Sequence, residues 1–282
     1  MRLNNFDWRY RNLLAEIIED GEWLETRGTR SKYIFGATIK HDMRQGFPAS
    51  TLSNFYPKSA INEMFNFDLQ SYGEVSEKYL SKGLLKIWKQ YLKGGSNYLP
   101  GSYSENWRAW PANSESLMTI DQLHKVVKSL NCNPTSRSHV VQSYNPSVSY
   151  KHGGMPNCSI GLVFSSDGEH LDLLQTGRSL DAITGLRGDF CRYGALLELI
   201  GALTNLIPRT LQFTTANTHI YDYDLNDAKA MFNLDIYPLP QFNWKAPPTT
   251  LTVEKNSWEL IGYQHNNFVK TGRLDLGEIN YK

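Results

Sequence analysis

The sequence predicts an α/β protein, in which helices and strands are interspersed along the chain. Two observations support this class: apolar residues recur at helical spacing in several segments and alternate with polar residues in others. A third observation, a hairpin pattern near the middle of the chain, adds two neighbouring strands. With 282 residues, of which 40% are hydrophobic, the chain is long enough to bury a full core. We therefore expect a single domain spanning residues 1–282.

The first helix is expected to begin at Asp7, because aspartate is a common N-terminal capping residue. Its apolar positions continue at helical spacing to Ile18, and Gly21 follows as a stop signal. The same spacing predicts further helices at Ser59–Leu69, around Trp88, from a cap at Thr119, at Tyr193–Ile207 and at Asp224–Phe232.

Strands are expected between these helices. An alternating pattern after a Gly/Thr/Arg loop predicts a strand that ends near Met43, and a short strand carries Arg137. The segment Ser159–Ser179 predicts a hairpin, because an Asp-Gly turn separates two apolar runs. The remaining strands are expected at Leu211–Tyr221 and Leu251–Glu254.

Composition narrows the class of function. The net charge of +1 provides no general basic field, so binding to nucleic acid is not expected. The three cysteines lie far apart without metal-ligand spacing, so we expect neither a disulfide framework nor a metal site. The N-terminus lacks the apolar core of a signal peptide, and no run approaches the roughly 18 apolar residues of a membrane span. We expect a protein of the cytoplasm, without contact to a membrane.

Cys158 is the first candidate catalytic residue. It follows Pro156-Asn157 and precedes an apolar run, which places its thiol at the start of a strand. Thiolate attack requires a lowered pKa, and Arg137 and Arg178 lie in the flanking segments. A small buried hydrophobic residue is the alternative interpretation of this cysteine.

Two other segments carry charge in informative places. Arg27 and Arg30 lie in the Gly/Thr/Arg loop, where backbone N–H groups and a guanidinium can both bind a phosphate; a solvated turn is the alternative. Glu63 stands among apolar residues of a predicted helix, and a carboxylate in such surroundings is a candidate proton carrier. The alternative is a glutamate on the helix surface.

Polar and aromatic residues gather at three more positions. Tyr103 belongs to an aromatic cluster beside a loop, which either packs in the core or stacks on a flat ring. Asp181 and Asp189 belong to a dense polar segment just before an apolar helix, a density that packing does not explain. His219 and Tyr221 alternate on a predicted strand and so share one face, where they either hold a sugar hydroxyl or pair structurally.

The ordered set of motifs resembles the thymidylate synthase family over nearly the whole chain. In order, the motifs are YIFG, FPASTLSNFYPKSAINE, IWKQY, NWRAWP, DQL, NPTSRS, PNCS, GRSLDAITGLRGDF and THIY. The resemblance implies an α/β fold with a large curved mixed sheet packed by helices. It also implies a homodimer that associates sheet to sheet, in which the partner contributes phosphate-binding arginines.

The resemblance assigns the nucleotide-binding residues. Cys158 matches the nucleophile that adds to C6 of the pyrimidine. Arg178 and Ser179 match the pair that binds the nucleotide phosphate. Arg137 matches the first of two arginines given to the neighbouring subunit, and Ser138 replaces the second. The family's N-terminal phosphate arginine falls near Arg27 or Arg30.

The resemblance also assigns the remaining site residues. Glu63 matches the glutamate that organises water and moves protons. Asp181 matches the aspartate that holds the folate pterin, and Trp88 matches a ring that lines the folate pocket. His219 and Tyr221 match the pair on the sugar 3′-hydroxyl. The implied co-substrate is 5,10-methylenetetrahydrofolate.

Asp189 departs from the family pattern. It stands where thymidylate synthases have the asparagine that reads the uracil edge. A carboxylate instead accepts hydrogen bonds from the N4 amino group of cytosine and from a protonated N3. The change favours a cytidine monophosphate, and the sequence is in this respect similar to the deoxycytidylate hydroxymethylases of phages. This resemblance implies the cytoplasm of a bacterium or of a phage-infected host.

Two further departures concern the reaction. Ser159 replaces the family's histidine, and the tail Val269–Lys282 lacks the segment that closes over the folate in thymidylate synthases. Closure excludes water, so a different tail favours addition of water and a 5-hydroxymethyl product. We expect dCMP as substrate, with CMP or dUMP as alternatives. Reductive methylation of dCMP or dUMP stays open, as does a non-catalytic nucleotide-binding regulator.

Overall fold

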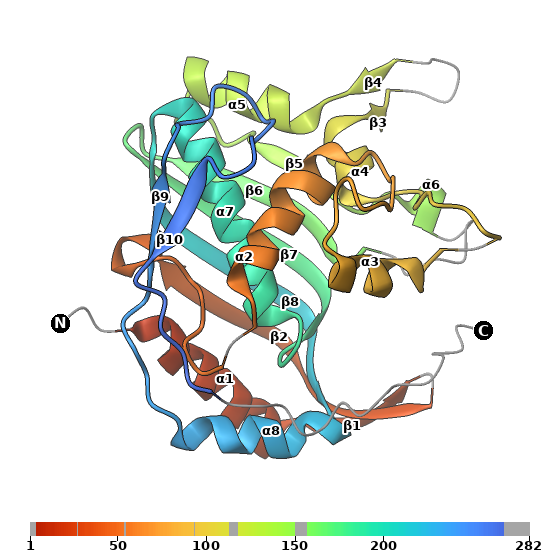
Figure 1. The fold of residues 1–282 in the computed structure, drawn as a ribbon, viewed down its shortest axis with the longest axis vertical. Helices are drawn as coiled ribbons and strands as arrows, with labels where there is room; N and C mark the ends of the chain where they lie inside the picture. Colours follow the sequence, from red (N-terminus) through yellow and green to blue (C-terminus); the bar gives the residue numbers. More distant parts are fainter. Residues whose placement is uncertain are drawn as a thin grey trace.

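A mixed six-stranded sheet forms the centre of the computed structural model, which describes residues 4–26, 28–53, 55–92, 94–112, 118–149 and 157–267 (Figure 1). The strand order is β1-β2-β8-β7-β6-β5. β7 and β8 are parallel, and the other neighbours in this sheet are antiparallel. The strands are β1 (Glu22–Thr26), β2 (Thr29–Asp42), β5 (Val140–Gln142), β6 (Ser159–Ser166), β7 (His170–Asp181) and β8 (Ile207–Tyr221). The expected α/β class with a large mixed sheet is confirmed.

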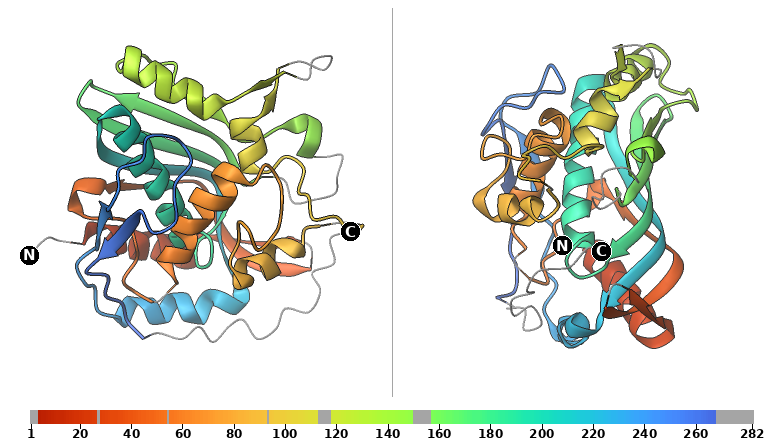
Figure 2. Two further views of the ribbon diagram at one scale, coloured as in Figure 1. Left: turned by 45° about the horizontal axis from the view of Figure 1, so that its top comes forward. Right: turned by 90° about the vertical axis from the view of Figure 1, so that its right-hand side faces the viewer.

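Helix α7 (Leu186–Thr204) is the central helix of the fold, because it connects the parallel strands β7 and β8 and is buried along most of its length. It lies between the sheet and an outer layer that includes α2 (Figure 2, right). The other helices are α1 (Asn5–Asp20), η1 (Met43–Gln45), α2 (Pro57–Asn62), η2 (Glu63–Asp68), α3 (Lys82–Lys89), α4 (Tyr103–Arg108), α5 (Gln122–Cys132), α6 (Pro146–Ser149), η3 (Asp222–Asp224), α8 (Leu225–Ala230) and η4 (Met231–Asn233).

The start of α7 differs from the prediction. The helix was expected at Tyr193–Ile207 but begins at Leu186, so Asp189 lies in its first turn. The polar residues there resemble a loop in the sequence, yet they have partners in the fold. Arg187, for example, donates to the carbonyl of Ile183 and to the hydroxyl of Ser53. Polar groups that are satisfied by distant segments can extend a helix that local composition would end.

The expected helix Ser59–Leu69 is two elements. Pro57 occupies the first turn of α2, where its missing N–H costs nothing. From Glu63 the chain continues as the π-helix η2, which accommodates one residue more per turn than an α-helix. This wider turn carries both Glu63 and Asp68 as buried residues on one short element. π-Helical turns occur frequently at functional sites.

Several predicted boundaries are wrong. Asn4, not Asp7, caps α1, and Asp7 is buried and accepts from the backbone and hydroxyl of Thr51. Asp121, not Thr119, caps α5, because Thr119 belongs to a short strand. Residues 251–254 form no strand. The two small sheets outside the main one are β3 (Trp110–Pro111) with β4 (Thr119–Ile120) and β9 (Gln241–Trp244) with β10 (Trp258–Ile261).

The core fills the space between the sheet and the helices. Phe190 of α7 stacks on Phe213 of β8 with ring centroids 4.2 Å apart, and Phe6 of α1 lies 4.8 Å from Phe190. These rings fix α7 against the sheet and against α1. Within the part of the chain that the structure describes, no helix combines the length and the apolar character needed to cross a membrane.

Candidate active site

Cys158 lies immediately before β6, half-buried, with an arginine beside its sulfur. The Nη2 atom of Arg178 is 3.9 Å from Sγ, and Nε donates to the carbonyl of Asn157 at 3.0 Å. The backbone N–H of Arg178 donates to the carbonyl of Cys158 at 2.9 Å, and a register shift in the β6–β7 pairing falls at Ser159. A fixed guanidinium beside a thiol favours the thiolate, the nucleophilic form.

Tyr103 connects this cysteine to the rest of the site. Its hydroxyl accepts from the backbone N–H of Ser159 at 3.1 Å, and its ring stacks on Trp107 at 5.0 Å. The guanidinium carbon of Arg192 lies 5.7 Å from the same ring. Burial raises the pKa of Tyr103 well above its usual value, so the phenol keeps its proton. Tyr103 is therefore more than a core ring, because it contacts both the backbone next to Cys158 and the side chain of Arg192.

Arg192 binds two carboxylates. Its Nε and Nη2 donate to Oδ2 of Asp68 at 2.9 and 2.5 Å, and its Nη1 donates to Oδ1 of Asp189 at 3.1 Å. Burial raises the pKa of Asp189 to about 6, with Arg192 opposing the rise and Glu63 adding to it. The same causes raise the pKa of Asp68 to about 7. The side chain expected to read the pyrimidine is thus held in a partly buried ionic cluster.

Glu63 is buried in the same region. It is 7% exposed, so the expectation of an embedded carboxylate is confirmed and the surface alternative is wrong. The indole Nε1 of Trp88 on α3 donates to Oε1 of Glu63 at 2.8 Å. This contact joins two residues that the sequence assigns to proton transfer and to the folate pocket.

The ends of the parallel strands β7 and β8 supply another group. The register pairs Ser179 with Asn217 and Asp181 with His219. Asn217 Oδ1 lies 2.8 Å from Nδ1 of His219, whose ring contacts that of Tyr221 edge to face at 5.0 Å. Burial lowers the pKa of His219, so the ring is neutral at physiological pH. The carboxyl ends of parallel strands are a common ligand-binding location.

Asp181 also organises the turn that leads into α7. Its Oδ1 accepts from the backbone N–H groups of Ile183 and Thr184 at 2.9 and 3.0 Å, and its Oδ2 accepts from the Thr184 hydroxyl. The carboxylate remains half-buried rather than enclosed. Asp181 is therefore fixed by its own turn, near both His219 and Asp189.

Two of the predicted arginines outside this network, Arg30 and Arg137, lie at the surface. Arg30 is exposed on β2, and its guanidinium stacks on Trp23 with 3.8 Å between the guanidinium carbon and the ring centroid. Arg137 is exposed in the turn between α5 and β5, not in the strand itself. Arg27 and the tail Val269–Lys282 fall outside the described residues.

The sequence interpretation missed Arg192 and Asp68. Arg192 follows Asp189 by three residues, a spacing at which opposite charges meet on a helix. Asp68 stands among apolar residues in the same way as Glu63, and the argument applied to Glu63 would have identified it. What the sequence does not reveal is that these two residues meet, because they are 124 positions apart.

The chain was also compared with models of protein families. A family model described as thymidylate synthase matches residues 8–272, nearly the whole chain.

Proposed function

This chain belongs to the thymidylate synthase family, whose members transfer a one-carbon unit to C5 of a pyrimidine nucleotide, and we propose that it hydroxymethylates dCMP at C5. The product is 5-hydroxymethyl-dCMP, and the reactants besides dCMP are 5,10-methylenetetrahydrofolate and water. The observation that carries this proposal is the carboxylate of Asp189, whose Oδ1 accepts from Nη1 of Arg192 at 3.1 Å. Arg192 also lies against the ring of Tyr103, which binds the backbone next to Cys158.

Asp189 supports cytosine over uracil by its hydrogen-bonding capacity. Ionised, it accepts hydrogen bonds only, which matches the N4 amino group of cytosine and a proton on N3. Uracil presents a carbonyl at O4, which offers such a carboxylate no donor. A proton held on N3 also withdraws electrons from the ring and makes C6 more electrophilic. Asp189 therefore both selects the base and activates it.

Cys158 attacks the activated ring. The thiolate forms a bond from Sγ to C6, and the electron pair of the C5=C6 bond moves to C5, which becomes the carbon nucleophile. Arg178, 3.9 Å from Sγ, stabilises the thiolate before attack. The hydroxyl of Tyr103 fixes the backbone of Ser159 next to the nucleophile. Formation of the product requires loss of the C5 proton, cleavage of the bond between the one-carbon unit and the folate nitrogen, so that tetrahydrofolate leaves, and addition of water to that carbon as the thiolate departs.

The folate position is supported by two residues of this chain. Trp88 is a half-buried ring that packs on Phe67 at 5.0 Å, and Asp181 is a half-buried carboxylate, a set that suits a flat heterocycle with N–H donors. When bound, the folate supplies the one-carbon unit. Glu63, held by Trp88, moves the proton of the water that becomes the new hydroxyl group.

Phosphate and sugar contacts complete the proposed site. Arg178 and Ser179 bind the phosphate from within the chain, and His219 and Tyr221 bind the sugar 3′-hydroxyl. The exposed position of Arg137 is consistent with a role in the neighbouring subunit of a homodimer. Arg27 and Arg30 remain the alternatives for the N-terminal phosphate arginine.

The sheet offers a surface for that dimer. Uncharged side chains on β2, β8, β7, β6 and β5 follow one another in register and stay exposed or half-exposed: Thr38, Thr214, Thr176, Leu174, Val163 and Val140. A continuous uncharged face of this kind is typical of an association surface. We propose that two copies pack through it.

Incubation with 5,10-methylenetetrahydrofolate and dCMP, CMP or dUMP tests the proposal. The products are identified by mass, and dihydrofolate is followed by its ultraviolet absorbance. Hydroxymethylated dCMP without dihydrofolate is the expected result. Methylated product with dihydrofolate would replace the hydroxymethylase assignment with reductive methylation, and turnover of dUMP alone would overturn the role of Asp189. Nucleotide binding without turnover of any substrate would favour the regulator.

A further inference from the structure

Arg192 occupies a position between two carboxylates that differ in their surroundings. Its Nε and Nη2 converge on one oxygen of Asp68, which is 1% exposed, and its Nη1 reaches Asp189. Asp68 comes from the π-helix η2 and Asp189 from the first turn of α7, so the arginine ties these elements together. The other oxygen of Asp68 has no hydrogen-bond partner within the described part of the chain.

We propose that Arg192, anchored by Asp68, is a positioning residue that keeps Asp189 a bare carboxylate and thereby determines which pyrimidine the enzyme accepts. This inference rests on the proposed role of Asp189 as the base reader. It assigns the choice of base to a pair of residues that the sequence comparison does not identify.

A single proton changes the hydrogen-bonding groups that Asp189 presents. A protonated carboxyl group has one O–H donor and one carbonyl acceptor, the same set as a carboxamide. Protonated Asp189 can therefore match the O4 acceptor and N3–H donor of uracil, as an asparagine does, and it matches the N3 acceptor and N4 donor of neutral cytosine equally well. Ionised Asp189 can match cytosine only. The base preference should then follow the ionisation of Asp189.

The groups around Asp189 make this ionisation sensitive to Arg192. Arg192 and Tyr193 face it from α7, Glu63 and Asp68 influence it from η2, and Asp181 influences it from β7. Arg192 is the cation in this set, and the others are carboxyl groups or a phenol. Burial and these neighbours raise the pKa of Asp189 to about 6 even with Arg192 present. Arg192 lowers the pKa of Asp189, so loss of the arginine should raise this pKa further.

The first test is Arg192→Gln, which removes the charge but keeps a side chain that can hydrogen-bond to Asp68. Dissociation constants of dCMP and dUMP are measured by calorimetry without folate, from about pH 5 to about pH 9, where carboxyl groups with raised pKa values titrate. For the wild type we expect the preference for dCMP to weaken as the pH falls through about 6. In the variant this change should occur at least one pH unit higher, with about a tenfold smaller dCMP preference at neutral pH.

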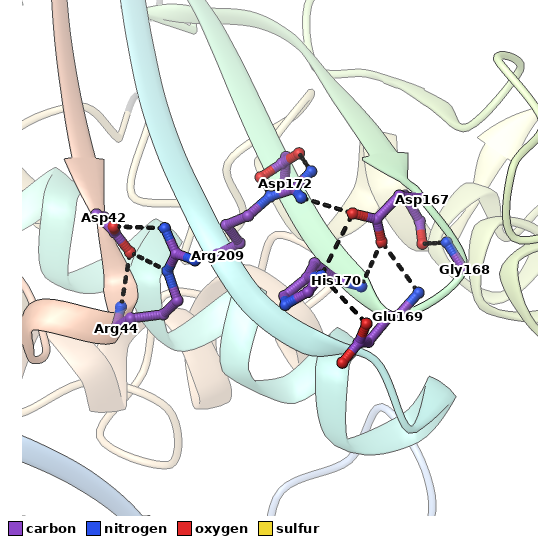
Figure 3. Close-up of polar contacts among 9 residues, drawn as sticks. Asp42, Arg44, Asp167, Gly168, Glu169, His170, Asp172 and Arg209 are labelled. Atoms are coloured by element: carbon purple, nitrogen blue, oxygen red, sulfur yellow. Dashed lines mark hydrogen bonds and ion pairs between the residues drawn. The ribbon is translucent and has the colours of Figure 1, made fainter.

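Asp68→Asn should shift the pH at which the base preference changes in the direction opposite to Arg192→Gln. Loss of the Asp68 charge removes a repulsive neighbour of Asp189 and frees Arg192 to bind Asp189 fully, so the change in preference should move to lower pH. Arg209→Gln is the matched control, because Arg209 also bridges two aspartates. It lies near the amino-terminal ends of β7 and β8, at the opposite end of these strands from Asp181 and His219 (Figure 3). It should leave both dissociation constants unchanged.

The outcomes separate this inference from the proposed reaction. Equal weakening of both nucleotides at every pH in Arg192→Gln, or a shift of the same sign in Asp68→Asn, would overturn the inference. If Arg192→Gln fails to fold, the sign of the Asp68→Asn shift decides alone. Because binding is measured without folate, a wild type that prefers dCMP but methylates it would overturn the hydroxymethylase proposal and leave this inference intact. A wild type that prefers dUMP at every pH would overturn both.

Discussion

Two arginines in this protein each bridge two aspartates, and the two clusters behave in opposite ways. Arg192 binds Asp68 and Asp189 beside the candidate nucleophile. Arg209 binds Asp172 through Nε at 2.9 Å and Asp167 through Nη1 at 2.6 Å, next to the β6–β7 turn (Figure 3). The hydrogen-bonding groups are the same in kind, so any difference must come from the surroundings.

Burial is the difference. Asp68 is 1% exposed and its pKa rises to about 7, whereas the Asp167 side chain is 46% exposed and its pKa falls well below the usual range. Backbone N–H groups of His170 and Glu169 contribute most to the fall at Asp167. In the site, loss of water outweighs the attraction of one arginine for several carboxylates. Similar contacts with an arginine thus leave Asp167 charged in acid, whereas Asp68 takes up a proton near neutral pH.

The largest difference should appear in base selection. We expect Asp189→Asn to shift the ratio of kcat/KM for dCMP over dUMP by about a hundredfold towards dUMP, because an amide leaves a mismatched polar group against cytosine. Asp172→Asn makes the same chemical change in the exposed cluster and should leave the ratio unchanged. Steady-state kinetics with both nucleotides measures it. A ratio unaffected by Asp189→Asn would mean that another residue reads the base.

The second largest difference should appear in the free energy of unfolding when the arginine of each cluster is removed. Arg192→Leu leaves Asp68 buried without its cation, so we expect a loss of about 3 kcal/mol in the free energy of unfolding near pH 8. The loss should shrink below about pH 7, where Asp68 takes up a proton. Arg209→Leu leaves its aspartates accessible to water and should change stability much less. Urea unfolding at the two pH values measures both effects, and equal losses in the two variants would contradict the comparison.

The pH dependence of stability should have opposite signs. The pKa of Asp68 is higher in the folded protein than its usual 3.8, so its contribution to stability is present at low pH and is lost as the pH rises towards about 7. The pKa of Asp172 is lowered by its hydrogen bonds to Arg209, against the effect of burial, so its contribution is present at neutral pH and is lost in acid.

Thermal unfolding of two variants tests these signs. Asp68→Asn should remove the decline in melting temperature between about pH 4 and about pH 7, and Asp172→Asn should reduce the loss of stability below about pH 4. Each variant serves as the control for the other, because both replace a carboxylate that binds an arginine. Identical pH profiles for the two variants would show that burial does not set the sign.

The predictability of these regions differs for a physical reason. The β6–β7 hairpin was predicted correctly, because an Asp-Gly turn and apolar alternation are local signals. The burial of Glu63 also followed from its apolar neighbours. By contrast, β1 was missed because all its residues are exposed and show no alternation. The first turns of α7 were not predicted as helix, because the partners of their charged residues, such as Ser53 for Arg187, lie far away in the sequence.

The candidate site follows the same rule. The resemblance assigned roles to single residues, and the structure places Arg178 beside Cys158 and Trp88 against Glu63. It also places Tyr103 and Asp189 on either side of Arg192. The ion pair between Arg192 and Asp68 could not be deduced from the sequence, because it depends on the π-helical turn that brings Asp68 to α7. Sequence patterns show which ionisable groups are present. Whether a buried carboxyl group is ionised depends instead on how many other carboxyl groups share its cation.

The smallest expected effect is that of removing one hydrogen-bond donor, the indole N–H of Trp88. The Trp88 indole gives buried Glu63 a hydrogen bond at 2.8 Å, just as backbone N–H groups serve exposed Asp167. Trp88→Phe keeps a ring for the folate but removes that donor, and a hydrogen bond to a charged group contributes about 1.5 kcal/mol, so kcat should fall about tenfold. Trp8→Phe changes an exposed tryptophan and is the control. An unchanged kcat with a raised KM for folate would instead limit Trp88 to binding, because proton movement by Glu63 would then not depend on its indole donor.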